Sequence, residues 1–420
     1  MVYSEISQLK QKPALWENIF VIFVLFLATG AIIPLIRKEN GMLFDPVQGD
    51  MVIQGLWFGI YIITFFLLLV RWRQAAYMAY QDKLIWLLVG LALVSVLWSG
   101  APALTLRRSI ALLGSSAFGI YLVIRFTWQE LLMLAAWALG LCAVLSFVFI
   151  VLLPSYGIHH DIQHNGAWRG IYVHKNALGR YMSLAAITWL LYTFNNISGR
   201  IVGLVFYSMS IVLLFLSISK TSIILFVLLL FPLLIYLYRL GRRRYVLSVI
   251  IITLGITCSA IFLTSPGQQE TSVPAQLPEV DLTLTGRTAL WHASWDMVQR
   301  RPWLGYGYSA FWLGYEEPSG HIWRDLHWEA PNAHNGYLDL WLQLGLVGLI
   351  FFIASIIVGM FKILVLICKR KGHFEVFSIF FILSLFINNI SESLILVQNC
   401  IFWILYVAIS AKITIGYRER

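Results

Sequence analysis

The segment PNAHNGYLDLWLQLGLVG, residues 331–348, combines the two features that decide this fold. Its first part is polar and places a titratable residue, His334, directly before Asn335. Its second part opens an apolar run of the length that crosses a membrane, about 20 residues. A long hydrophilic stretch, residues 265–333, comes just before. The pattern predicts a catalytic or binding site where a polar loop meets a membrane helix. The alternative is that His334 only caps that helix.

The composition is that of a polytopic membrane protein. Of the 420 residues, 60% are hydrophobic and 12% are charged, whereas a soluble domain has about 25% charged residues. The net charge of +10 does not indicate nucleic-acid binding, because the basic residues lie in short loops, where they set topology and attract anionic lipid. The four cysteines lie in or beside apolar runs without metal-ligand spacing, so we interpret them as small core residues.

We expect an all-α membrane protein with about twelve transmembrane helices and one large outer loop. Helices one to nine occupy residues 1–264, the loop occupies 265–337, and the last three helices occupy 338–420. The first apolar run lacks a cleavage site and is interpreted as a retained helix. The apolar runs predict helices at 17–36, 52–70, 83–99, 104–124, 128–153, 177–195, 201–219, 221–238, 246–264, 338–361, 375–390 and 394–415.

The basic residues predict the orientation of these helices. If the N-terminus is cytoplasmic, most of the 30 Lys and Arg residues lie on the inner side, including the clusters Arg242–Arg244 and Lys369–Lys371. This asymmetry is the one that cytoplasmic loops normally carry. The loop 265–337 then faces outward, as does a second hydrophilic loop at 154–176.

Several outer basic residues lie at the ends of predicted helices rather than within loops. Arg107 lies at the start of the fourth helix, Lys175 and Arg180 flank the start of the sixth, and Lys220 lies between the seventh and eighth. An ionisable residue at membrane depth usually faces a cavity or a partner. Because few carboxylates are nearby, this group indicates an anionic ligand. The alternative is that the side chains extend to lipid phosphates.

Three motifs follow one another in a fixed order. The first contains Lys220 between two apolar helices, and the second is a Gly-Arg pair with Arg287 followed by the sequence RPWLGYG at 301–307. The third is His334–Asn335, followed after nine residues by Gly345 and after two more by Gly348. This set resembles the superfamily of O-antigen ligases, O-antigen polymerases and bacterial exopolysaccharide polymerases, most clearly over residues 200–350.

Two further segments, 98–108 and 174–176, are more similar to the exopolysaccharide-polymerase branch of that superfamily. At Lys220 the ligases more commonly have an arginine, whose planar fork suits phosphate better than an ammonium group does. The resemblance implies a bacterial inner-membrane glycosyltransferase with its large loop and its site in the periplasm. It also implies a donor glycan on polyprenyl pyrophosphate and an acceptor that is a glycan or a lipid-linked sugar. Membrane lipid is a further implied partner.

The implied chemistry assigns roles to single residues. Lys220 and Arg287 are expected to bind the pyrophosphate and to stabilise the charge that develops on it, with Arg107 and Lys175 as further basic contacts. His334, with an ordinary pKa near 6.5, can accept the proton of the attacking hydroxyl. Asn335 can orient the acceptor or the imidazole. Because the leaving group is already activated, we expect no cofactor and no metal.

Other side chains have two interpretations each. Trp303 and Tyr306 can stack on sugars, or they can belong to an aromatic belt at the membrane interface. Glu392 can bind sugar hydroxyls or pair with an outer arginine, and we favour pairing. In the second outer loop the irregular spacing favours solvated residues over a zinc site for His159, His160, Asp161 and His164.

The favoured function is polymerisation of exopolysaccharide repeat units, and the second is the ligase reaction, which transfers a glycan to the lipid A core. A different class, a secondary transporter or lipid flippase, would show an internal repeat and ionisable residues in the middle of several helices. No repeat is visible, and the charges gather at one face. Both observations favour an enzyme.

Overall fold

The computed structural model describes residues 13–31, 50–161, 164–195, 199–264, 287–315, 318–369 and 373–418. Within these ranges the regular elements are helices, and the β contact is an isolated bridge between Ile158 and Trp168. Five described helices are long and apolar enough to cross a membrane, and a bent pair makes a sixth. The five are α4 (Met51–Leu69), α7 (Pro102–Arg125), α8 (Trp128–Leu152), α12 (Lys220–Arg239) and α16 (Gly336–Lys369).

The bent pair consists of α5 (Trp72–Gln81) and α6 (Lys83–Val94), and the short η1 (Ser95–Leu97) continues α6. The chain bends by 95° between α5 and α6. The remaining elements are α2 (Leu15–Leu27), α9 (Pro154–Gly157), α10 (Lys175–Asn195), α11 (Arg200–Leu216), α13 (Arg243–Thr264), α14 (Arg287–Arg300), α15 (Ser319–Leu326), α17 (His373–Asn388) and α18 (Ile401–Arg418). Each of the twelve predicted ranges overlaps a helix. Twelve membrane crossings stay a prediction, because α2, α11 and the apolar parts of α17 and α18 are shorter than a typical span.

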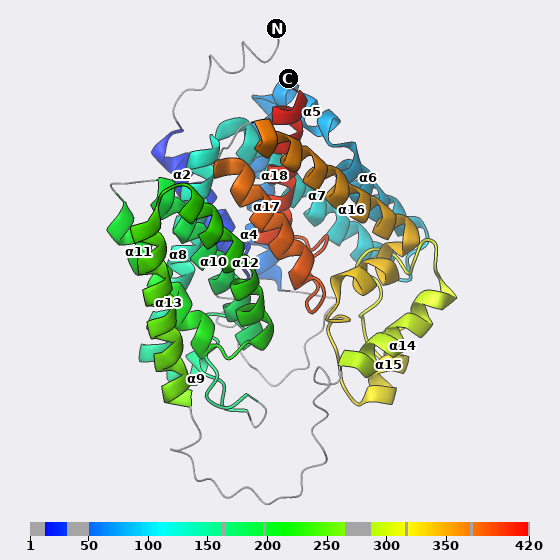
Figure 1. The fold of residues 1–420 in the computed structure, drawn as a ribbon. Helices are drawn as coiled ribbons and strands as arrows, with labels where there is room; N and C mark the ends of the chain where they lie inside the picture. The colour runs from blue at the N-terminus through cyan, green and yellow to red at the C-terminus, as the bar shows by residue number, and fades with distance from the viewer. Residues whose placement is uncertain are drawn as a thin grey trace, which may run out of the picture.

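The helices form two groups around a buried centre. Helices α10 to α13 pack beside one another on one side, and α16 and α18 pack against α5, α6 and α7 on the other (Figure 1). Helix α17 lies between the two groups and contacts α10 and α12 as well as α16 and α18. Helix α18 is the inner element, since residues 401–411 are all buried. A helix that is apolar all round fits such an interior position. In contrast, α4 exposes large apolar side chains such as Met51 and Phe58, as a lipid-facing helix would.

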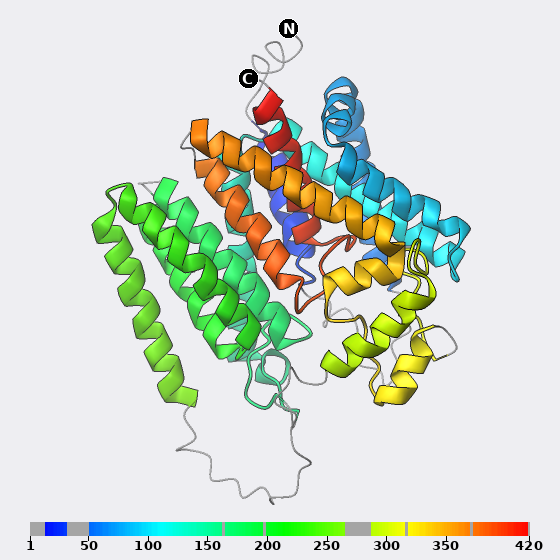
Figure 2. The ribbon, with the colours of Figure 1, turned by 45° about the vertical axis from the view of Figure 1, so that its right-hand side comes forward.

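The polar connections gather at one end of the molecule. Helices α9, α14 and α15 lie at this end, whereas the α12–α13 turn and the C-terminal end of α16 lie at the opposite end (Figure 2). The predicted topology requires this separation, because it places the basic clusters on the inner side and the loops on the outer side. The orientation relative to a membrane, like the periplasmic location of the loop, stays a prediction. Of the loop itself, residues 265–286 lie outside the described ranges.

Helix α16 is interrupted at Gly345, which has φ 66° and ψ −171°. The break leaves backbone groups of α16 without their helical hydrogen-bond partners. Backbone groups of the preceding loop take the place of those partners. The carbonyl of Leu342 accepts a hydrogen bond from the N–H of Tyr306 at 2.8 Å, and the N–H of Leu346 donates to the carbonyl of Pro302 at 2.8 Å. The RPWLGYG sequence therefore bonds directly to the backbone around the glycine of the third motif, and together they form the joint between the long loop and α16.

The last predicted helix, 394–415, begins only at Ile401. The apolar residues before it are irregular because other elements satisfy their backbone: the Leu394 N–H donates to Asn389 Oδ1 at 2.8 Å, and the Leu396 carbonyl accepts from the Tyr308 hydroxyl. Irregular backbone is tolerated at membrane depth where protein surrounds it. Hydropathy alone cannot distinguish this buried connection from a helix.

Candidate active site

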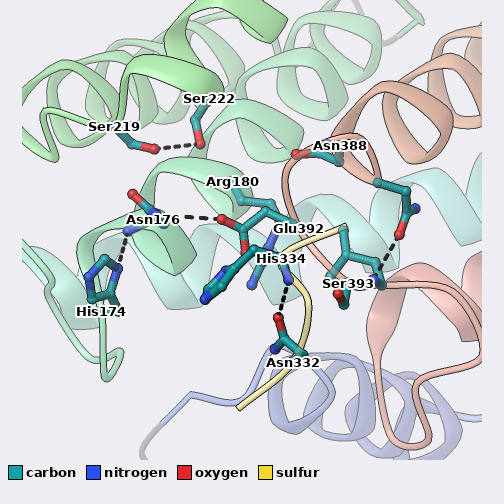
Figure 3. Close-up of polar contacts among 12 residues, drawn as sticks. His174, Asn176, Arg180, Ser219, Ser222, Asn332, His334, Asn388, Glu392 and Ser393 are labelled. Atoms are coloured by element: carbon teal, nitrogen blue, oxygen red, sulfur yellow. Dashed lines mark hydrogen bonds and ion pairs between the residues drawn. The ribbon is translucent and has the colours of Figure 1, made fainter. Parts of the chain in front are cut away.

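Glu392, in the connection between α17 and α18, is the centre of a charged cluster (Figure 3). Its carboxylate lies 2.9 Å from Arg180 Nη1 and 3.7 Å from Arg287 Nη2. Asn176 Nδ2 donates to the same carboxylate at 3.5 Å. The predicted pairing of Glu392 with an arginine is confirmed. Because two guanidinium groups face one carboxylate, the cluster keeps a net positive charge.

His334 lies beside this cluster, in the turn before α16 (Figure 3). Its backbone N–H donates to Asn332 Oδ1 at 2.9 Å, and its ring stacks on Trp328 with centroids 5.5 Å apart and an interplanar angle of 13°. Its φ of 47° lies in the left-handed region, which is uncommon for residues other than glycine. The ring atom Nδ1 is buried and has no hydrogen-bond partner among the described residues.

The surroundings of His334 favour the neutral imidazole. Burial lowers the pKa of His334 below its ordinary value; the negative charge of Glu392 opposes this shift, and the charges of Arg287 and Arg180 add to it. A neutral histidine with an unpartnered ring nitrogen is able to accept a proton at pH 7. The neutral imidazole is the protonation state that a general base requires.

Asn335, not His334, caps α16. Its Oδ1 accepts hydrogen bonds from the N–H groups of Tyr337 at 3.1 Å and Leu338 at 3.2 Å, as an N-cap asparagine does. The interpretation of His334 as the helix cap is wrong. The side-chain oxygen of Asn335 is engaged by the helix, so the residue fixes where α16 begins and thereby where His334 lies.

Asp339, which the sequence analysis did not select, holds this turn in place. Its buried carboxylate accepts hydrogen bonds from the Ala333 N–H at 3.0 Å, from Trp312 Nε1 at 2.7 Å and from the Ser393 hydroxyl. It thus ties the long loop and the α17–α18 connection to the residue before His334. The available signal was a carboxylate in an apolar membrane helix, which is rare and usually has a function or a partner.

Lys175, Lys220 and Arg287 are the first residues of α10, α12 and α14. A helix N-terminus carries a partial positive charge, so each of these positions adds the field of its helix to the charge of its side chain. Arg287 and Asn176, the neighbour of Lys175, both contact Glu392. Lys220 is exposed and lies close enough to Lys175 for their charges to interact. The structure brings these three predicted residues to one end of the helices.

Gly179 permits the approach of α12 to α10. A Cβ atom at this position would lie 2.8 Å from Ser219 Cβ and 3.0 Å from Ser222 Oγ, which is too close for any side chain. The two serine hydroxyls are hydrogen-bonded to each other at 3.0 Å (Figure 3). The polar interruption before Lys220 is therefore the place where the first turns of the two helices contact each other.

The structure places the other predicted residues elsewhere. Arg107 is exposed near the start of α7, and the neighbouring Arg108 donates to the Ser309 carbonyl at 3.1 Å. Tyr306 is buried in the core of the long loop and its hydroxyl donates to the Met297 carbonyl at 3.0 Å. Trp303, in contrast, is 66% exposed. Of the two predicted aromatic contacts, Trp303 is therefore the one with an exposed side chain.

The histidines of the second outer loop are more ordered than the sequence indicates. The rings of His159, His164 and His174 lie 5.0–5.5 Å apart. The interpretation of His159 as a solvated residue is wrong: it is buried, its Nδ1 contacts Asp161 at 2.8 Å, and its Nε2 accepts from the Lys175 N–H at 3.2 Å. In the part of the chain that the structure describes, no group of three ligating side chains is placed to hold a metal.

Comparison with known proteins confirms the resemblance that the motifs indicated. Residues 204–353 match the sequence model of the family described as O-antigen ligase. A stretch of 84 residues is 29% identical to the exopolysaccharide production protein ExoQ of Rhizobium meliloti (strain 1021) and covers 19% of each chain, so the match spans about a fifth of that relative. The family match includes Lys220, Arg287 and His334, whereas Arg180 and Glu392 lie outside it.

Proposed function

We propose that the protein is a glycosyltransferase that moves a glycan from polyprenyl pyrophosphate to a sugar hydroxyl, with polymerisation of exopolysaccharide repeat units as the favoured reaction. One observation carries this proposal. His334 has a buried Nδ1 that finds no hydrogen-bond partner in the described part of the chain, and it lies beside a cluster with net positive charge. A hydroxyl that attacks a pyrophosphate-activated sugar requires a base to take its proton and an anion site to stabilise the leaving pyrophosphate. Here the two lie side by side.

The donor binds through its pyrophosphate in this account. Arg287, Lys220 and Lys175 contact the phosphate oxygens, and the partial positive charge of their helix N-termini adds to the attraction. Arg180, held by Glu392 at 2.9 Å, contributes positive charge without being free to move. The polyprenyl chain lies among the apolar helices, which explains why the site is at the end of a multi-pass membrane protein.

The chemical step is a displacement at the anomeric carbon. The acceptor oxygen forms a bond to this carbon while the bond from carbon to the pyrophosphate oxygen breaks. The electron pair leaves with the polyprenyl pyrophosphate, whose charge the basic residues stabilise. The hydroxyl proton moves to His334. General-base catalysis of this kind typically accelerates a reaction by about 10²–10⁴-fold. The step balances without an oxidant, a reductant or a nucleotide.

The location follows from the same proposal. The cluster includes Arg287, the first residue of α14, and α14 lies with α9 and α15 at one end of the molecule (Figures 1 and 2). The distribution of Lys and Arg predicts that this end is periplasmic. Lipid-linked glycans on that face of the bacterial inner membrane would reach the site from the lipid without crossing the membrane.

A second candidate function is the ligase reaction on the lipid A core. The description of the matched family, O-antigen ligase, favours it, whereas the exopolysaccharide role in the name of the relative favours polymerisation. The two reactions share the donor and the base and differ only in the acceptor.

Deletion of the gene and analysis of the glycans separates the two. Accumulated single repeat units on the lipid carrier indicate a polymerase, and an undecorated lipid A core indicates a ligase. Complementation with the intact gene should restore the glycan, and complementation with His334→Asn should not. A deletion strain with normal surface glycans would contradict both functions.

A further inference from the structure

A second basic site lies at the opposite end of α10 to α13. The end of α10, the start of α11 and the α12–α13 turn enclose a pocket of about 340 Å³, within the range of small-molecule sites, about 300–1,000 Å³. It is lined by Thr193, Phe194, Arg200, Gly241, Arg242, Arg243, Arg244 and Tyr245. Helix α10 has 21 residues and so is about 30 Å long, which separates this pocket from the Glu392 cluster.

We propose that this pocket binds the phosphate group of an anionic phospholipid. Four of its eight lining residues are arginines, and none is Asp or Glu. Among the described residues, no ion pair joins a carboxylate to Arg200 or to Arg242–Arg244. Guanidinium groups present a planar fork of donors that matches phosphate oxygens.

Aromatic rings hold two of these arginines in place. The guanidinium carbon of Arg242 lies 5.0 Å from the ring centre of Phe194, and that of Arg243 lies 5.2 Å from the ring of Tyr238. A cation over a ring face is attracted without using its N–H donors. The donors of both side chains therefore stay available to a ligand.

The start of α11 adds a partial positive charge. Arg200 is the first residue of this helix. The helix macrodipole favours an anion near such an end. In this pocket the helix end is a second contribution, beside four arginine side chains.

An exposed apolar stripe next to the pocket indicates that the anion belongs to a lipid. Leu247, Ile251 and Leu254 of α13 are 58–61% exposed, and their spacing places them on one face of the helix. The stripe begins one turn after Arg243. Ile201, next to Arg200, is 80% exposed. A phospholipid with its phosphate in the pocket would lay its acyl chains along these side chains, as basic pockets between membrane helices allow.

The test uses the full-length protein in detergent and native mass spectrometry with added phosphatidylglycerol or phosphatidylcholine. Arg242→Ala/Arg243→Ala should bind phosphatidylglycerol about tenfold or more weakly, since each lost hydrogen bond to a charged group corresponds to about a factor of ten or more. Binding of phosphatidylcholine should not change. Arg242→Lys/Arg243→Lys keeps the charge, so its affinity for phosphatidylglycerol should lie between those of the wild type and the alanine variant. Binding by this lysine variant would also show that the fold tolerates substitution at both positions.

The matched control removes two basic residues elsewhere. Arg73 and Lys83 also lie over aromatic rings, those of Trp72 and Tyr80, but they do not line the pocket. Arg73→Ala/Lys83→Ala should bind phosphatidylglycerol as the wild type does. Equal binding by the pocket variant and the wild type would overturn the site. Arginine-dependent binding of inorganic phosphate without any preference for phosphatidylglycerol would overturn its assignment to a lipid.

Discussion

Arg180 Nη1 lies 2.9 Å from Glu392 Oε2, and this contact joins α10 to a connection 212 residues later in the chain. The same carboxylate holds Arg287 at 3.7 Å. One acid therefore sets the positions of two cations beside His334. The proposed anion site is an organised cluster, in which the acid fixes the geometry while the net charge stays positive.

Replacement of Glu392 by Gln should release both arginines from their positions. Loss of a hydrogen bond to a charged group destabilises a protein by about 1.5–3 kcal/mol, so the unfolding temperature in detergent should fall and donor turnover should decrease. Glu130→Gln is the control, because Glu130 also accepts hydrogen bonds, from Thr127, but at the exposed start of α8. A Glu392→Gln protein with wild-type stability and turnover would show that the ion pairs are incidental.

Lys220→Ala and Arg287→Ala should each slow turnover with any acceptor. A donor aimed at developing charge contributes about 3 kcal/mol, or about a hundredfold in rate. Lys220→Arg should keep much of the activity, because the charge stays and the fork suits phosphate. Arg300→Ala, at the exposed end of α14, is the control and should turn over normally. Normal turnover in both Lys220→Ala and Arg287→Ala would refute the anion site.

Gly345→Ala should destabilise the joint between α16 and the long loop. The added Cβ would lie 2.1 Å from the Trp303 carbonyl oxygen, at a residue with φ 66°, and backbone strain of this kind typically costs about 1–3 kcal/mol. Gly255→Ala is the matched control, since nothing lies within 4 Å of its added Cβ. Thermal unfolding in detergent should show a lower midpoint for Gly345→Ala alone. Equal midpoints would mean that the joint can relax.

Activity of the purified enzyme should persist in excess EDTA, because the pyrophosphate is already an activated leaving group and the basic residues supply the charge that stabilises it. Activity that EDTA abolishes and a divalent cation restores would contradict this expectation. His159→Ala would then be the next variant to measure, since its Nδ1 contacts Asp161 at 2.8 Å.

Local patterns predicted most of the helices and part of the site. Lys220 and His334 are predicted because each is a polar residue at the edge of an apolar run, and Arg287 is predicted from the motif order that carries the family resemblance. Arg180 was noted beside Lys175 but was not assigned, and its role depends on Glu392, a contact between distant parts of the chain. No pattern of neighbouring residues contains such a contact.

The errors in the helix map have a similar origin. Helix α5 was missed because its sequence, WRQAAYMAYQ, is too polar to register as a span. The residues 394–400 were assigned to a helix because they are apolar, yet Tyr308 and Asn389 bond their backbone instead. The break at Gly345 also depends on the loop that fills it. Tertiary hydrogen bonds decide the last two of these cases.

The pH dependence of kcat/KM in the wild type and in His334→Asn tests the central claim most directly. Burial lowers the pKa of His334, so the base is neutral at pH 7, and kcat/KM should fall only as the pH drops below the ordinary histidine value. Asparagine tolerates the left-handed φ of 47° at this position but cannot accept the proton. The account predicts that His334→Asn folds, binds donor, loses about 10²–10⁴-fold in rate and lacks the acidic limb. A stable His334→Asn enzyme with near wild-type kcat/KM and an unchanged acidic limb would contradict it.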